Sequence, residues 1–220
     1  MHVRPFMDFL IGRFKKLGYV AQWKILDTED FGAPQHRARW YLVAIRADCV
    51  RQRLAADWFP QNRPCLSLAN IVKKLPDRRW MPTPAKKDRL AYGNVMAAYK
   101  KLNEKGINPF TEPVIIDMRC SKKFRTFRVS GSPCITYTRG SSQSYWCSTK
   151  GGCLTVSELG MLQGFGPTDI DWKGAGLSPT QYGGMLGNAQ SLCVVEALLP
   201  HVLYASKIID AEDFQLLTSA

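Results

Sequence analysis

Residues 30–39 have the sequence DFGAPQHRAR and lead directly into the apolar run WYLVAI. Pro34 fixes a turn in this loop, and Gln35, Arg37 and Arg39 alternate along the extended segment that follows. Alternate side chains of an extended segment project to one side, so we expect one amide and two guanidinium groups to converge there. This set suits a phosphate or the edge of a nucleobase, because arginine offers a planar fork of donors and glutamine offers a donor and an acceptor. The alternative is an exposed entry to a strand that carries two solvated arginines.

The segments on either side of this loop predict one edge of an α/β domain. Apolar residues at helical spacing predict an amphipathic helix over residues 6–17, with Gly18 as its stop. Residues 19–26 and the apolar run 40–45 predict two strands, separated by a turn at 27–35. The order helix, strand, loop, strand is typical of an α/β fold.

Prolines interrupt the chain repeatedly after residue 47 and indicate a small irregular module over residues 47–150. Helices at 66–75 and 88–105 and a strand at 114–118 are expected within it.

Regular structure is expected again near residue 154. A T-x-x-E capping box at 155–158 predicts a helix that continues to Gln163. A second helix is predicted from about Asn188, with Pro200 expected to bend it. The acidic tail after Ile209 is expected to fray.

The composition indicates an ordinary globular protein. At 220 residues, with 45% hydrophobic and 22% charged residues, the chain can form one core or one core plus a small module. Its seven cysteines are an odd number without a CxxC pair, so the sequence suggests neither a disulfide framework nor a zinc site. No signal peptide or membrane anchor is visible, and we expect an intracellular protein, nuclear in a eukaryote or cytoplasmic in a bacterium.

The net charge of +12 is concentrated in the middle of the chain. Residues 57–150 hold 18 lysines and arginines against 6 aspartates and glutamates, and the remaining positions are balanced. Such a segment is typical of a surface that binds a polyanion, although a merely solvated surface is the alternative. The residues that we expect to contact nucleic acid are Lys73, Lys74, Arg78, Arg79, Lys86, Lys87, Lys122, Lys123, Arg125 and Arg139.

Three stretches resemble, in the right order, motifs of the cytosine-5 DNA methyltransferases. Residues 30–39 resemble the G-x-P-Q-x-R-x-R signature, 154–165 resemble the late helix with L-T-x-x-E and L-Q-G-F, and 182–189 resemble the final G-N-A motif. The basic segment then falls where the family keeps its target-recognition domain. Two departures lie in the late helix, where Gly152 and Ser157 replace the usual arginines, and Gly166 follows L-Q-G-F before the proline.

The resemblance implies the C-terminal part of a Rossmann-like methyltransferase fold, a strand hairpin plus helices with a target-recognition module. The implied division is 1–46 for the edge of the catalytic domain, 47–150 for the module, 151–209 for the return to the catalytic domain, and 210–220 for a tail.

The resemblance also implies a chemistry. Complete enzymes of the family flip a cytosine out of the duplex, attack its carbon 6 with a cysteine thiolate and transfer a methyl group from S-adenosylmethionine to carbon 5. Arg39 would hold the pyrimidine carbonyl oxygen, and Arg37 and Gln35 would shape the loop. Asn188 and Ala189 would close one side of the cofactor pocket.

The family's nucleophile and main cofactor motif are not found in these 220 residues. In the family, F-x-G-x-G, P-C-Q and E-N-V all precede G-x-P-Q, whereas here 31 residues precede Gly32 and none of them is a cysteine. Cys65 and Cys134 do follow prolines, but they lie after the loop and are expected to be structural thiols.

Three hypotheses remain open at the level of sequence. The chain could be a fragment of a full methyltransferase, one subunit of a split enzyme that needs a separate N-terminal half, or a non-catalytic DNA-binding protein. An RNA cytosine methyltransferase relative is a further alternative, because one branch of the family modifies transfer RNA. In each case the isolated chain is expected to be inactive.

Binding to duplex DNA is expected to weaken steeply as salt rises, because the positive charge of residues 57–150 would neutralise phosphates and release counterions. Affinity for a duplex at low and at physiological salt tests this. Neutralising Lys73, Lys74, Arg78 and Arg79 should weaken binding. An affinity that does not respond to salt, or to these substitutions, contradicts the prediction.

Overall fold

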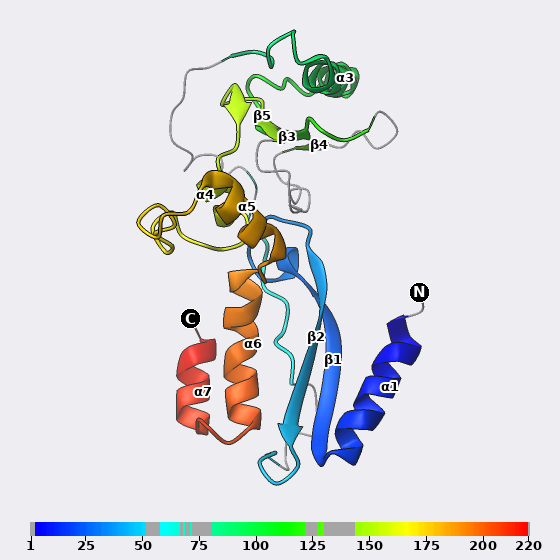
Figure 1. Ribbon diagram of the computed structural model, residues 1–220, viewed down its shortest axis with the longest axis vertical. Coiled ribbons are helices and arrows are strands. Elements are labelled where there is room, and N and C mark those ends of the chain that lie inside the picture. Colours follow the sequence, from blue (N-terminus) through cyan, green and yellow to red (C-terminus); the bar gives the residue numbers. More distant parts are fainter. Residues whose placement is uncertain are drawn as a thin grey trace.

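The computed structural model describes residues 3–51, 58–66, 68, 71, 81–121, 127–129 and 144–219. The molecule is elongated (Figure 1), with a long strand hairpin flanked by helices at one end and a small sheet with a helix at the other. Short helices lie between the two ends.

The hairpin consists of β1 (Tyr19–Asp27) and β2 (Ala38–Arg46), which pair antiparallel along their whole length. Helix α1 (Val3–Lys16) precedes it and ends just before Gly18, whose φ of 82° is a conformation that side chains other than glycine rarely adopt. The helix and the two strands expected at this edge are therefore confirmed.

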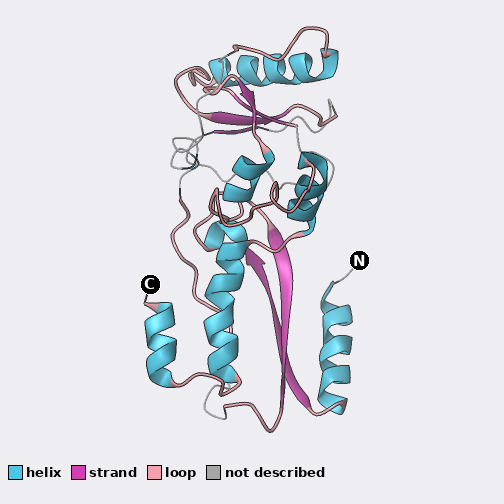
Figure 2. Ribbon diagram, turned by 60° about the vertical axis from the view of Figure 1, so that its left-hand side comes forward, coloured by secondary structure: helices cyan, strands magenta, loops and turns pink. Residues whose placement is uncertain are grey.

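Each face of the hairpin meets a different helix, as Figure 2 also shows. Leu26, Val43 and Ile45 point to one face and share a buried cluster with Val194 and Leu198 of α6 (Leu192–Ala205). The opposite face lies against α1. Because helices pack on both faces, apolar residues occur at both odd and even positions along the strands.

The distal sheet has the strand order β4-β3-β5-β6. Its strands are β3 (Val114–Asp117), β4 (Phe127–Val129), β5 (Tyr145–Cys147) and β6 (Gly152–Cys153). Helix α3 (Arg89–Glu104) begins at Asp88, whose side chain accepts a hydrogen bond from the Ala91 N–H. The helix expected at 88–105 and the strand expected at 114–118 are confirmed.

The distal sheet is covered on both faces. Val114 and Ile116 pack against α3, whereas Ile115 belongs to a cluster with Leu159 of α4 (Val156–Met161) and Leu186 of α5 (Pro179–Asn188). All three β3 side chains are at most 1% exposed. Strand β3 therefore joins the module to the rest of the protein through hydrophobic burial.

The capping box at the start of α4 is confirmed. The Thr155 hydroxyl accepts a hydrogen bond from the Glu158 N–H at 3.3 Å, and the Glu158 carboxylate accepts one from the Thr155 N–H at 2.6 Å. Two donors that the helix start would leave unpaired are thereby satisfied.

Two expectations for the C-terminal region need correction. The helix expected from about Asn188 begins at Leu192, and Asn188 is instead the last residue of α5, which its glycines had concealed. The tail is not frayed but forms α7 (Ala211–Thr218), because Asp210 accepts hydrogen bonds from two N–H groups of its first turn.

The helix expected at 66–75 lies largely outside the described residues. Among the helices that the structure describes, none is long and apolar enough to cross a bilayer.

Replacing Thr155 by alanine is expected to lower the free energy of unfolding by about 1 kcal/mol, because the capping hydroxyl is lost. Urea denaturation of the chain measures this change. Thr180→Ala, at an exposed position of α5, is the matched control and should change stability far less. Equal losses in both variants would show that the capping box has no special role.

Candidate functional site

The loop between the two hairpin strands lies where three distant segments meet. A 3-10 turn, η1 (Thr28–Asp30), follows β1, and the chain then crosses through Gly32 before entering β2. Gly32 has a φ of 96°, which accounts for glycine at this position of the loop. The Gly32 carbonyl accepts a hydrogen bond from the Leu66 N–H at 3.2 Å, so the chain near residue 66 runs beside the loop.

Arg37 is the centre of this junction. Its side chain is 2% exposed, and its Nη2 donates hydrogen bonds to the carbonyl oxygens of Gly187 at 2.9 Å and Ala189 at 2.8 Å. Burial lowers the pKa of the Arg37 guanidinium, and the nearby positive charge of Arg39 lowers it further. Arginine nevertheless stays protonated in proteins, so a buried cation ties the loop to the C-terminal end of α5.

The backbone of Arg37 is also held on both sides. Its N–H donates to Asp27 Oδ1 at 2.7 Å, and its carbonyl accepts from the Thr28 hydroxyl at 3.4 Å. The Thr28 and Ser191 hydroxyls form a hydrogen bond of 2.6 Å, which is a second link, between the loop and the start of α6. The conformation that precedes β2 is therefore determined by groups from both ends of the chain.

Gln35 does not present its amide to a surface. The residue is fully buried, and among the described residues its side-chain oxygen and nitrogen have no hydrogen-bond partner. The expectation that Gln35, Arg37 and Arg39 project together to one exposed side is wrong, because residues 35 and 37 precede β2 and turn inward. The alternative of two solvated arginines is wrong as well, since Arg37 is buried.

Arg39 is the accessible arginine of the pair. It lies near the start of β2, opposite Leu26, on the face that packs against α6. Its Nη1 donates to the adjacent Ala38 carbonyl at 2.7 Å, and the side chain is only partly buried. The Arg39 guanidinium can therefore turn towards a ligand, whereas the Arg37 guanidinium donates hydrogen bonds to two carbonyl oxygens.

The two residues expected at the cofactor pocket lie at the end of α5. Asn188 is exposed, and Ala189 caps the helix while its carbonyl receives the Arg37 bond. A cavity of about 380 Å³ lies elsewhere, lined mainly by apolar residues of the 31–34 loop, the 161–167 segment and Cys193. Neither Asn188 nor Ala189 lines it.

The described thiols near the loop do not have the surroundings of a nucleophile. Burial raises the pKa of Cys193 to about 11. Partial burial raises the pKa of Cys65, and the carboxylates of Glu29, Asp30 and Asp27 raise it further. Both thiols are therefore protonated at neutral pH. Cys134 lies outside the described residues.

The structure describes two of the ten residues expected to contact nucleic acid. Lys86 and Lys87 are exposed just before α3, and Lys100 and Lys101 on α3 add exposed positive charge nearby. The other eight lie outside the described residues: Lys73, Lys74, Arg78, Arg79, Lys122, Lys123, Arg125 and Arg139.

Sequence reasoning missed the groups that hold the loop, namely Asp27, Thr28 and Ser191. A signal for Asp27 was its position at the end of a predicted strand, where polar side chains commonly support a following loop. Nothing in the sequence paired Thr28 with Ser191, which is 163 residues away.

Arg37→Ala is expected to destabilise the chain by about 3 kcal/mol or more, because two charge-assisted hydrogen bonds disappear and two partly buried carbonyls lose their donor. Arg39→Ala should leave the melting temperature nearly unchanged. Thermal and urea unfolding of the two variants measure the contrast. Equal stability of the two variants would contradict the assigned roles.

Comparison with known proteins places these features in a family. A family model described as C-5 cytosine-specific DNA methylase matches residues 5–203. The type II methyltransferase M.NaeI of Lentzea aerocolonigenes is 42% identical over 41 residues, which is 19% of this chain and 10% of that protein. A putative type II methyltransferase of Oceanobacillus iheyensis, M.OihORF3336P, is 32% identical over 74 residues, 34% of this chain and 14% of that protein.

A solved structure agrees on the fold. The Entamoeba histolytica methyltransferase EhMeth superposes with a TM-score of 0.55 at 14% identity, over 93% of this chain and 59% of that chain. The matches thus span less than two thirds of each of these proteins, and only 10% and 14% of the two type II methyltransferases. The likeness in fold covers nearly the whole chain, and the family model covers 199 residues from 5 to 203. The chain belongs to the C-5 cytosine-specific DNA methylase family.

Proposed function

We propose that this chain is the C-terminal portion of a DNA cytosine-5 methyltransferase, which grips the target cytosine and binds double-stranded DNA. The observation that carries the proposal is the different fate of two neighbouring arginines. Arg37 is buried and bonded to two carbonyls, whereas Arg39 is partly exposed beside it. Arg37 stabilises the loop that forms the site, and Arg39 is left to contact the substrate.

Arg39 would act as a hydrogen-bond donor to the carbonyl oxygen of a flipped cytosine. Its guanidinium cannot serve as an acid or base, because it does not lose its proton in proteins. It can stabilise negative charge that develops on the pyrimidine when carbon 6 is attacked. The positive charge of the buried Arg37 nearby adds to the same field.

The residues present fit one wall of a cofactor site. Asn188 is exposed at the end of α5, and the adjacent backbone is fixed because Ala189 accepts the Arg37 bond. A rigid helix end with an exposed amide can hold polar groups of S-adenosylmethionine. That cofactor, when bound, supplies the methyl group for carbon 5. The other walls would come from the family's F-x-G-x-G segment.

The nucleophile would come from an N-terminal half that carries the P-C-Q cysteine. Two features support such a partner. Ile25 and Trp40 form a cross-strand pair on the α1 side of the hairpin and remain 55% and 50% exposed, and the exposed Phe6 of α1 packs edge-on against Trp40. In addition, this chain corresponds to only 59% of the EhMeth chain. An exposed apolar face on a two-stranded sheet favours burial against further strands or helices.

The module between residues 47 and 150 would hold the duplex through its phosphates, with base-reading side chains supplied from the same module. Exposed Lys86, Lys87, Lys100 and Lys101 support this part of the proposal. The sheet that carries the module is anchored by β3, so phosphate contacts would be held at a defined distance from Arg39.

The chain alone is expected to transfer no methyl group, because it contains no P-C-Q cysteine and the thiols of Cys65 and Cys193 are protonated at neutral pH. Incorporation of label from S-adenosylmethionine into duplex DNA measures this. Adding an N-terminal half that carries the P-C-Q cysteine should restore transfer. Label incorporated by the chain alone would contradict the assignment of the nucleophile to another segment.

Arg39→Ala, in a complex restored with an N-terminal half, is expected to lower turnover by about 10- to 1000-fold. This corresponds to roughly 1.4–4 kcal/mol, the range for one lost charge-assisted or transition-state hydrogen bond. Arg46→Ala, which removes an exposed arginine at the far end of β2, is the matched control. Full turnover in Arg39→Ala would remove the base-gripping role from this residue.

A further inference from the structure

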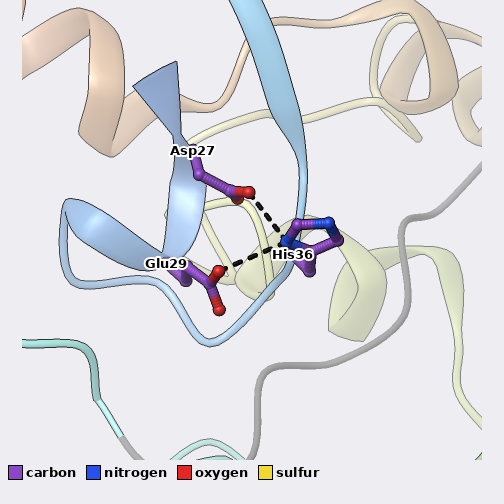
Figure 3. Close-up of side chains that lie close together, drawn as sticks. All are labelled: Asp27, Glu29 and His36. Atoms are coloured by element: carbon purple, nitrogen blue, oxygen red, sulfur yellow. Dashed lines mark hydrogen bonds and ion pairs between the residues drawn. The ribbon is translucent and has the colours of Figure 1, made fainter. Parts of the chain in front are cut away.

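Asp27, Glu29 and His36 bring one nitrogen and two carboxylate oxygens together at the start of the loop (Figure 3). His36 Nδ1 lies 2.7 Å from Asp27 Oδ2 and 3.2 Å from Glu29 Oε1, and the three atoms are all within 4.8 Å of one another. The function proposed above uses neither Glu29 nor His36.

The three donors are held by different elements. Asp27 ends β1, and its Oδ1 is fixed by the Arg37 N–H, so Oδ2 is turned towards His36. Glu29 belongs to the η1 turn, and His36 stands on the far side of the loop with 56% of its side chain exposed. The donors are therefore ordered on one side and accessible to solvent on the other.

The charge of the cluster favours a cation. Both carboxylates lie next to the same nitrogen, His36 Nδ1. Two carboxylates and one imidazolium would still give the cluster a net negative charge. The influence of this charge reaches Cys65, because Glu29, Asp30 and Asp27 all raise the pKa of its thiol. A divalent cation bound by a neutral imidazole and two carboxylates would form a site with no net charge.

We propose that His36 Nδ1, Asp27 Oδ2 and Glu29 Oε1 bind a divalent first-row transition-metal ion. Metal–ligand bonds of about 2.0–2.2 Å place neighbouring donors roughly 3 Å apart at right angles and about 4 Å apart when opposite. The two spacings from His36 Nδ1, 2.7 and 3.2 Å, fit neighbouring donors after Asp27 and His36 separate by a few tenths of an ångström. An imidazole with two carboxylates suits zinc, cobalt or manganese more than magnesium or calcium, and water would complete the coordination.

A bound ion would join the end of β1 to the residue directly before Arg37. It would therefore stabilise the loop conformation that Arg37 and Asp27 already maintain. The expected consequence is a higher melting temperature, by roughly 5–10 °C when the ion is present at a hundredfold excess over its dissociation constant.

Cobalt(II) is a suitable probe, because its visible absorption reports coordination by nitrogen and oxygen, and sulfur ligands add an intense near-ultraviolet band. The full chain is titrated with cobalt(II) and compared with His36→Ala and Glu29→Gln, which leave the Asp27–Arg37 bond in place. Glu104→Gln, at an exposed position of α3, is the matched control. We expect the two cluster variants to lose at least about 10-fold in affinity and the control to lose none.

The difference spectrum between the original chain and His36→Ala should show visible bands without the sulfur band. The thermal shift with cobalt(II) or zinc(II) should disappear in both cluster variants. Unchanged cobalt affinity in His36→Ala, or a sulfur band in the difference spectrum, would overturn the proposal. Because no step involves DNA or methyl transfer, this result is independent of the proposed methyltransferase role.

Discussion

The buried guanidinium of Arg37 is the interaction on which the junction of this protein depends. A desolvated cation is costly unless acceptors surround it, and the carbonyl oxygens of Gly187 and Ala189 accept from it at 2.9 and 2.8 Å. These acceptors lie 150 and 152 residues further along the chain, at the end of α5. The hairpin loop and the G-N-A motif are thus held together by one side chain, and the Thr28–Ser191 contact adds a second link beside it.

This constraint explains why the neighbouring arginine is available. With Arg37 fixed at its side chain and through its N–H to Asp27, the chain enters β2 in one conformation and places Arg39 on the face that packs against α6. A ligand that reaches Arg39 therefore meets a donor whose backbone is already ordered, which limits the entropy lost on binding. The cluster of Asp27, Glu29 and His36 lies on the same loop, so a cation bound there would stabilise the same ordered loop conformation.

The basic module depends on a different force. Strand β3 is apolar at consecutive positions because Val114 and Ile116 pack on α3 while Ile115 packs on α4 and α5. Hydrophobic burial is non-directional, and here it positions the module, whereas directional hydrogen bonds position the loop. Arg39 and the exposed lysines before and on α3 thus lie in parts of the molecule that are stabilised separately, with the proposed base-gripping and phosphate-binding roles divided between them.

Local signals in the sequence determined the first helix, both hairpin strands, α3, β3 and the capping box, because each depends on periodicity or on residues within one turn of one another. The family also followed from short ordered motifs. Helix α5 was missed because its glycines mask a helix that Ser178 caps and tertiary packing stabilises, and α7 was missed because its Asp210 cap was read as part of an acidic tail. The inward turn of Gln35 and Arg37, and the contrast between Arg37 and Arg39, were decided only by the tertiary structure. The two arginines stand two residues apart in the same local pattern, and what distinguishes them is a pair of carbonyl groups 150 residues away.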